Sequence, residues 1–290
     1  MYIADKWTDY ELIDAGSGER LERWGKYKLI RPDPQVIWSS DKKSREWQNA
    51  SASYTRSESG GGNWKGLSNL PEKWQIGYQR LGLTFNIKPM GFKHTGLFPE
   101  QAVNWEWFYD LIKNAGRPVK VLNLFAYTGG ATLAAAAAGA SVTHVDAAKG
   151  IVSQARENAN SSGLSEKPIR LIVDDCRKFT EREIRRENYY DAVIMDPPSY
   201  GRGPTGEVWK LEENIDDLVK LTVDVLSDDP LFFLINSYTT GLSPSTLGYI
   251  LGIRIKERYG GHTECDEVGI PVQKSGLVLP CGSAARWTNK

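Results

Sequence analysis

Residues 119–138 have the sequence VKVLNLFAYTGGATLAAAAA. The segment Val119–Phe125 is mostly apolar and predicts a buried β-strand. Ala126–Gly130 contains a glycine pair typical of a tight turn, and Ala131–Ala138 predicts a helix of very small side chains. A strand, a glycine turn and a helix in this order indicate the first repeat of a parallel α/β sheet.

The same alternation continues to residue 236, which predicts a doubly wound, Rossmann-like α/β fold with helices on both faces of a parallel sheet. We expect ligands at the carboxyl edge of such a sheet. The further predicted strands are 142–145, 169–173, 192–195 and 231–236, and the predicted helices are 149–161, 179–186 and 212–226. The tail, 249–287, has short strand-like segments and the turn residues Gly260-Gly261, which favour a closing hairpin.

The N-terminal part has a different texture, because six of the ten tryptophans lie in the first hundred residues. We predict a small aromatic-rich β domain over residues 1–95 and an α/β domain over residues 96–290, whose first helix covers 104–114. The predicted strands of the small domain are 27–31, 36–38, 74–78 and 81–87, separated in part by the polar stretch 51–59 and the glycines 60–62.

The composition limits the function classes. Lys plus Arg and Asp plus Glu both total 36, so the net charge is zero and any nucleic-acid surface must be local. The cysteines Cys176, Cys265 and Cys281 show no metal-ligand spacing, and we expect no metal site. The chain also lacks a membrane span or secretory signal, which predicts a cytoplasmic protein without membrane partners. A homodimer is compatible with the sequence.

Carboxylates follow successive predicted strands. Asp146 ends the second strand, where it can accept hydrogen bonds from ribose hydroxyls, and Asp175 follows the third, where it can accept from an adenine amine. Any one of them alone is typical of a turn or helix cap. The turn at Gly129 departs from the G-x-G-x-x-G fingerprint, which disfavours a dehydrogenase.

The fourth predicted strand ends in Asp196-Pro197-Pro198-Ser199-Tyr200. The prolines fix φ and hold the backbone extended, so the carbonyls after Asp196 point in set directions. Such a turn is an acceptor site for a flat, amine-bearing group, although a simple strand terminator has the same sequence.

The segments Asn123–Gly130, His144–Asp146, Val173–Cys176 and Asp196–Tyr200 together resemble the class I S-adenosylmethionine-dependent methyltransferases. More narrowly, they are similar to the bacterial large-subunit ribosomal RNA methyltransferases that make 5-methylcytosine or 7-methylguanine. The stretch 95–101 resembles the family's entry loop over the cofactor, although Ala102 follows where the family usually has arginine. The resemblance implies an S-adenosylmethionine site with contacts from Phe98, Gln101, Phe125, Tyr127, Thr128, Gly129, Asp146, Ala147, Asp175, Cys176 and Asp196.

The residues favour methylation of a nitrogen. Asp196 and the carbonyl of Pro197 would accept hydrogen bonds from the base, and Tyr200 would stack on it. Carbon-5 methylation instead needs a thiolate, and the fifth predicted strand is followed by Ser237, Tyr238 and Thr239 without a cysteine. We therefore predict a methyltransferase acting on a nucleobase, with ribosomal RNA favoured. The alternatives are a small-molecule or protein amine as substrate, and an RNA-binding module without turnover.

Overall fold

The computed structural model describes residues 1–57, 61–91, 93–202 and 208–289, and they form two compact units. The larger unit contains residues 1–2, 104–268 and the chain from Gly282 on, and the smaller contains 3–103 and 269–281. The predicted domain boundary after residue 95 differs from this division. Residues 96–103 and the distal end of the C-terminal hairpin group with the smaller unit.

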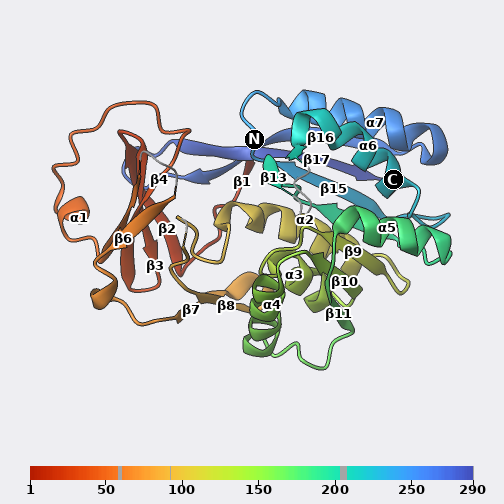
Figure 1. Cartoon of the computed structure of the whole chain (residues 1–290), viewed down its shortest axis with the longest axis horizontal. Helices are drawn as coiled ribbons and strands as arrows, with labels where there is room; N and C mark the ends of the chain where they lie inside the picture. Colours follow the sequence, from red (N-terminus) through yellow and green to blue (C-terminus); the bar gives the residue numbers. More distant parts are fainter. Residues whose placement is uncertain (58–60, 92, 203–207, 290) are drawn as a thin grey trace. The chain divides into compact units, whose positions relative to one another are not determined.

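An eight-stranded sheet forms the centre of the larger unit, in the order β1-β16-β17-β15-β12-β9-β10-β11 (Figure 1). The five strands from β15 to β11 are parallel, whereas β17 runs antiparallel to β15. The bounds are β1 Tyr2–Ile3, β9 Lys120–Leu124, β10 Ser141–Asp146, β11 Ile169–Val173, β12 Ala192–Met195, β15 Phe232–Ser237, β16 His262–Pro271 and β17 Val278–Thr288. This arrangement confirms the predicted α/β fold.

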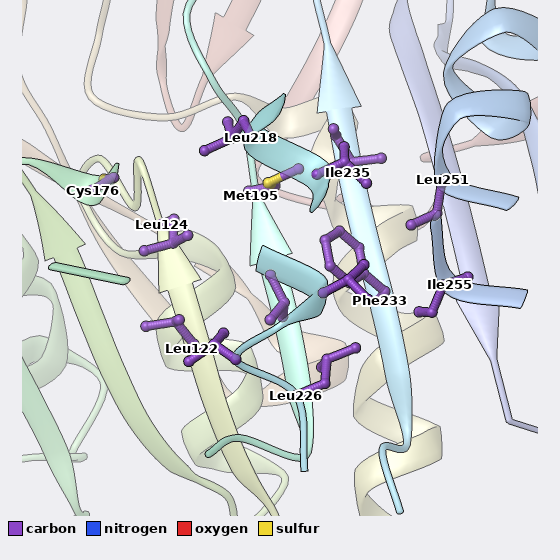
Figure 2. Packing of buried hydrophobic residues seen from close by; sticks show 14 of the residues in the cluster. Leu122, Leu124, Cys176, Met195, Leu218, Leu226, Phe233, Ile235, Leu251 and Ile255 are labelled. Carbon is purple, nitrogen blue, oxygen red and sulfur yellow. The ribbon is translucent and has the colours of Figure 1, made fainter. Parts of the chain in front are cut away.

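Helices cover both faces of this sheet. They are α2 Ala102–Lys113, α3 Gly130–Ala137, α4 Lys149–Ser161, α5 Cys176–Arg185, α6 Leu211–Val223 and α7 Pro244–Tyr259. On one face, side chains of β9, β12 and β15 stand in register and pack against α5, α6 and α7 (Figure 2). These rows are Leu122, Val193 and Phe233, then Leu124, Met195 and Ile235. On the opposite face Phe108 of α2 stacks on Phe232, with ring centroids 5.7 Å apart.

The smaller unit is rich in β-structure. Five of its strands form a sheet in sequence order, and two more form a separate antiparallel pair. The bounds are β2 Tyr10–Gly16, β3 Glu19–Trp24, β4 Tyr27–Pro32, β5 Ala52–Arg56, β6 Gly62–Lys65, β7 Trp74–Tyr78 and β8 Leu83–Ile87. Short helices lie at α1 Arg45–Gln48, η1 Leu67–Asn69, η2 Gln79–Leu81 and η3 Pro99–Gln101.

Several predicted elements were wrong. Residues 36–38 are not a strand, because Ile37 projects into solvent and Trp38 is held by its indole N–H on the carbonyl of Ala15. The start of the tail is the helix α7, which Gly260 terminates, and the hairpin turn lies instead between β16 and β17. Strands β2, β3, β5 and β6 were not predicted from the sequence. No helix in the described part of the chain is long and apolar enough to cross a bilayer.

Candidate active site

The turn after β9 is held in an unusual backbone conformation. Phe125, Tyr127 and Gly129 all have positive φ, at 54°, 49° and 90°. Each of the two non-glycine residues costs about 1 kcal/mol or more in this region, so the surrounding structure must hold them there. A hydrogen bond to the neighbouring strand β10 holds the turn, since the amide of Ala126 donates to the carbonyl of Val145 at 3.1 Å. The turn is therefore fixed against the end of β10.

The two glycines allow α3 to start close to its neighbours. A Cβ atom on Gly130 would lie 2.6 Å from Cζ2 of Trp105, far inside normal contact. A Cβ on Gly129 would lie 3.1 Å from both Ala155 and Leu133. The glycine pair thus serves helix packing as well as the turn, and the alanines of α3 fit the same crowded space.

Asp146 lies at the end of β10, directly beside this turn. Its Oδ2 accepts the amide N–H of Tyr127 at 3.0 Å, and its Oδ1 accepts that of Ala148 at 2.9 Å. Since each carboxylate oxygen has two lone pairs, these bonds leave acceptor capacity for a ligand. Ala147, the residue between Asp146 and Ala148 in the chain, is exposed to solvent.

The end of β11 contributes Asp174, Asp175 and Cys176. Asp175 caps α5, since its Oδ1 accepts the amide of Lys178 at 2.8 Å, while Asp174 is paired with Arg182. Asp175 is therefore a helix cap, which was one of the two roles that the sequence allowed for it. A capping carboxylate still has free lone pairs that can accept hydrogen bonds from a ligand. Val173, just before them, is 49 % exposed and adds an apolar surface at this edge.

Cys176 is a buried structural residue that joins three strand ends. Its Sγ accepts the amide of Phe125 at 3.2 Å, and the thiol donates to the carbonyl of Val145 at 3.6 Å. Burial raises the pKa of the thiol well above its usual range. Figure 2 shows its side chain near Leu124 at the edge of the core. The thiol is therefore neutral and holds the turn in place.

Behind the turn lies a buried polar chain that the sequence did not indicate as a unit. Asn123 Nδ2 donates to Thr132 Oγ1 at 2.9 Å, and Thr132 Oγ1 lies 2.9 Å from His144 Nδ1. Burial lowers the pKa of His144 to about 4, so the ring is neutral. The chain ties β9, α3 and β10 together.

The segment Asp196–Ser199 follows β12, between β15 and β9, and is called the substrate loop below after the base-binding role predicted for it from the sequence. Pro197 is buried, whereas Asp196 is partly buried. The carbonyl of Pro198 accepts the indole N–H of Trp209 at 2.6 Å. Ser199 is held twice: its carbonyl accepts the amide of Leu211 at 3.0 Å, and its Oγ accepts the hydroxyl of Thr239 at 2.8 Å.

Tyr200 begins a short hairpin of β13 (Tyr200–Arg202) and β14 (Val208–Lys210), in which it pairs with Lys210. Its side chain is 53 % exposed. Lys210 forms an ion pair with Glu213. The sequence also allows a flexible loop over residues 201–206 that could place Arg202 on a phosphate, or an ordinary exposed loop. Residues 203–207 and the Arg202 side chain lie outside the described part of the chain.

Phe98 and Gln101 belong to the smaller unit. The ring of Phe98 packs against His94, with centroids 5.5 Å apart, and its carbonyl accepts the amide of Gln101 at 3.1 Å. Gln101 is buried at the end of η3. Their contact with the cofactor stays a prediction from the resemblance.

Trp209 also lies at this edge, and no role was predicted for it from the sequence. Besides its bond to the substrate loop, its ring lies 6.3 Å from that of Phe125, tilted by 37°. In the sequence, Trp209 stands just before a predicted amphipathic helix. A tryptophan at such a position is usually a core residue, so the sequence gives no reason to place it in the site. Its bond to a specific carbonyl depends on the hairpin, and the sequence gives no register for it.

Within the described residues, no group of three or more His, Cys, Asp or Glu side chains could hold a metal ion. The carboxyl edge of the sheet combines the glycine turn, the carboxylates Asp146, Asp175 and Asp196, and the rest of the substrate loop. These lie at the ends of β9, β10, β11 and β12, which are neighbours in the sheet order β12-β9-β10-β11. The predicted residues of the larger unit are thus brought to one edge.

Comparisons with known proteins agree with this arrangement. A family model described as S-adenosylmethionine-dependent methyltransferase matches residues 51–226. The crystal structure of an S-adenosylmethionine-dependent methyltransferase from Agrobacterium tumefaciens is 39% identical, with a TM-score of 0.91, and covers 99% of this chain and 93% of that one. A putative methyltransferase from Streptococcus mutans is 18% identical with a TM-score of 0.75, covering 98% of this chain and 76% of its own, and shows the shared fold.

A ribosomal RNA large subunit methyltransferase K/L from Shewanella frigidimarina is 29% identical over 157 residues. The match covers 53% of this chain but 21% of that relative, so the chain spans about a fifth of the relative's length. The family model, by contrast, covers more than half of this chain, and the Agrobacterium structure matches nearly all of it. The chain therefore belongs to the S-adenosylmethionine-dependent methyltransferase family.

Proposed function

We propose that this methyltransferase modifies a nitrogen atom of a nucleobase in RNA, with ribosomal RNA as the favoured substrate class. The support is twofold. The similarity to the Shewanella enzyme, whose name gives ribosomal RNA as its substrate, favours RNA. The fixed acceptors of the substrate loop, together with the absence of an activated thiol among the three cysteines, favour nitrogen over carbon, and this second observation carries the proposal.

The residues of the cofactor side fit S-adenosylmethionine. The Asp146 carboxylate, held by the amides of Tyr127 and Ala148, would accept the ribose hydroxyls, and Asp175 would accept the adenine amine. The exposed Val173 offers an apolar surface for the adenine ring. When bound, the cofactor supplies a methyl group on a positively charged sulfur, which leaves readily as a thioether.

The cofactor contacts proposed for the turn are those of Phe125, Tyr127, Thr128 and Gly129, with Ala147 and Cys176 beside them. Gly129 has no side chain of its own and supplies the positive φ of the turn, which would let a ligand approach the backbone closely. The carbonyl of Thr128 accepts a hydrogen bond from the side-chain Nδ2 of Asn158 at 2.9 Å, which fixes the turn from the side of α4. A preorganised turn of this kind places the cofactor without a rearrangement on binding.

On the substrate side, the Asp196 carboxylate and the Pro197 carbonyl would accept hydrogen bonds from the base. The prolines fix their directions, and position matters more than acid strength when the leaving group is good. The exposed ring of Tyr200 would stack on the base. The chain's own contribution is therefore alignment of a nitrogen lone pair.

The cysteines do not support carbon-5 chemistry, which needs a thiolate nucleophile. Burial raises the pKa of Cys176 and of Cys281, and Cys281 belongs to the smaller unit. Burial also raises the pKa of Cys265, with help from Asp266 and Glu264. All three thiols are thus protonated near neutral pH.

The test is methyl transfer from methyl-labelled S-adenosylmethionine to RNA isolated from cells that lack the gene. We expect label in RNA, recovered by nucleoside mass spectrometry as an N-methylated base. Asp196→Asn should lower kcat by about 100-fold, because it removes a charged acceptor that positions the base. Asp228→Asn is the matched control. It makes the same change at an exposed turn before β15, at the opposite edge of the sheet, and should leave kcat unchanged.

Three outcomes would contradict the proposal. Label only in protein or small-molecule fractions would favour the alternative amine substrates. Recovery of 5-methylcytosine as the only product would show that a thiol acts despite its raised pKa. Equal loss of activity in Asp196→Asn and Asp228→Asn would remove the substrate loop from the site.

A further inference from the structure

Trp209 connects the substrate loop to the turn after β9, residues 125–129, which is called the cofactor turn below. Its indole N–H donates to the carbonyl of Pro198 at 2.6 Å, a short hydrogen bond. The same ring lies against Phe125, the first residue of the cofactor turn with positive φ. Both rings also pack on the buried cluster beneath the sheet edge. One side chain therefore contacts both halves of the site.

The substrate loop is also held from its other side. Thr239 lies just after β15, the strand that pairs with β12 on the side away from β9. Its hydroxyl donates to Ser199 Oγ at 2.8 Å, and its amide donates to Ser237 Oγ at 3.1 Å. Since the prolines already restrict the backbone, the three external bonds from Trp209, Leu211 and Thr239 leave the loop little freedom.

Trp209 and Tyr200 occupy opposite faces of the β13–β14 hairpin. Tyr200 pairs with Lys210, and Gly201 pairs with Trp209, so the two rings lie one register step apart. Successive residues of a strand point to opposite faces. The face of Trp209 is turned to Pro198 and Phe125, whereas Tyr200 is largely exposed. The inner ring is placed to hold the loop and the outer ring to meet a base.

We propose that Trp209 is a positioning residue, which sets the direction of the substrate loop through the Pro198 carbonyl and fixes its distance from the cofactor turn through Phe125. Thr239 completes this clamp. The inference rests on the proposed function, since it assigns the alignment of the methyl-accepting nitrogen to these two side chains. It assigns no contact with the base to Trp209 itself.

Two variants separate the contributions of the indole. Trp209→Phe keeps a ring against Phe125 but removes the N–H, and should lower kcat by about 10-fold. Trp209→Leu removes both and should lower kcat by about 100-fold, as expected for a loss of alignment. The Kd for S-adenosylmethionine and the KM for RNA should stay within about 2-fold in Trp209→Phe, because binding groups are untouched.

Thr239→Val removes the hydroxyl bond at nearly constant volume and should lower kcat by several-fold. Combined with Trp209→Phe, it completes a double-mutant cycle. We expect the combined loss to differ from the product of the single losses, because both side chains act on one short loop. Should Trp209→Leu fail to fold, this cycle still decides the proposal.

Trp287→Phe is the matched control, since it also removes an indole hydrogen bond, to the carbonyl of Gly260 at 2.9 Å. Trp287 is fully buried, so this variant should lower Tm while kcat is retained. Equal kcat in Trp209→Phe and the unaltered enzyme would overturn the positioning role, as would a kcat loss matched by Trp287→Phe. Absence of RNA methylation by the unaltered enzyme would overturn the proposed function itself, and the two failures are therefore distinguishable.

Discussion

At Gly130 a missing side chain determines where a helix can begin. The edge of the Trp105 ring occupies the space that a Cβ would need, with 2.6 Å between them. One residue earlier, Gly129 supplies the positive φ that turns the chain into α3. Two adjacent glycines therefore serve separate purposes, one conformational and one steric, and both shape the turn that is proposed to bind the cofactor.

We expect Gly130→Ala to weaken S-adenosylmethionine binding by about 10-fold and to lower the free energy of unfolding by about 1–3 kcal/mol, the usual cost of overpacking. Isothermal titration and urea unfolding measure the two effects. Gly150→Ala is the control, because a Cβ there meets nothing within 4 Å and the residue lies in the first turn of α4. Unchanged affinity in Gly130→Ala would show that the Trp105 ring can shift away from the added methyl group without disturbing the cofactor site.

Strand β3 shows why some elements escape hydrophobic patterning. Its central Glu22 is completely buried, with Arg31 donating Nε and Nη2 at 2.6 and 2.7 Å and Tyr10 donating its hydroxyl at 2.8 Å. Burial alone would raise the pKa of Glu22, but the charges of Arg20 and Arg31 and these hydrogen bonds lower it to about 2. The strand is held by paired charges where a core normally has apolar residues.

Glu22→Gln should lower the free energy of unfolding of the smaller unit by about 3–5 kcal/mol, because it leaves buried arginines without their counter-charge. Tryptophan fluorescence during urea unfolding reports mainly this unit, since six of the ten tryptophans precede residue 100. The exposed Glu46→Gln, which breaks an ion pair with Lys28, should cost under about 1 kcal/mol. Similar losses in the two variants would contradict the assignment.

The same carboxylate gives a pH dependence. With the pKa of Glu22 near 2 in the folded state, its contribution is complete above the ordinary carboxyl pKa of about 4.5 and is lost as the pH falls toward 2. Between these pH values, the free energy of unfolding should therefore fall less steeply with decreasing pH in Glu22→Gln than in the unaltered protein, as measured by urea unfolding at each pH.

Much of the α/β sheet was predictable because its strands are mostly apolar: β12 is buried along its whole length, and the partly exposed edge strand β11 still consists mainly of apolar residues. The segments 169–173 and 192–195 are strands with the predicted bounds, and Lys149–Ser161 is the predicted helix. The carboxylates were found because strand ends converge at one edge. Trp209 was not predictable, since a long-range hydrogen bond leaves no local pattern. The start of α7 does carry a local signal, because Ser243 caps the helix and Pro244 follows it, but the glycines and isoleucines within the helix favour turns and strands.

At the scale of the whole molecule, the net charge is zero, and individual basic side chains are also paired with acidic ones. Basic residues of the smaller unit are engaged by acids, as in the pairs Lys42–Glu19 and Arg23–Glu11. Such pairs add little to stability but reduce the positive potential available to phosphates. Binding of RNA by this chain should therefore depend less on phosphate contacts than binding by a basic protein.

We expect the apparent affinity for RNA to fall by less than about 100-fold between about 50 and 200 mM KCl. A protein with many phosphate contacts loses about 10³- to 10⁵-fold over this range. Filter binding with the same RNA used for methyl transfer measures the slope. A steeper decline would show that unpaired cations gather on one surface.

The last strand of the sheet lies between two earlier ones. β17 is inserted between β15 and β16, so the pairing of β15 on that side depends on residues up to Thr288 (Figure 1). During synthesis on the ribosome, the parallel strands emerge before the segment that covers their open edge. The larger unit therefore cannot complete its sheet co-translationally until Val278–Thr288 has left the exit tunnel, and until then β15 exposes a strand edge open to chaperones or to aggregation.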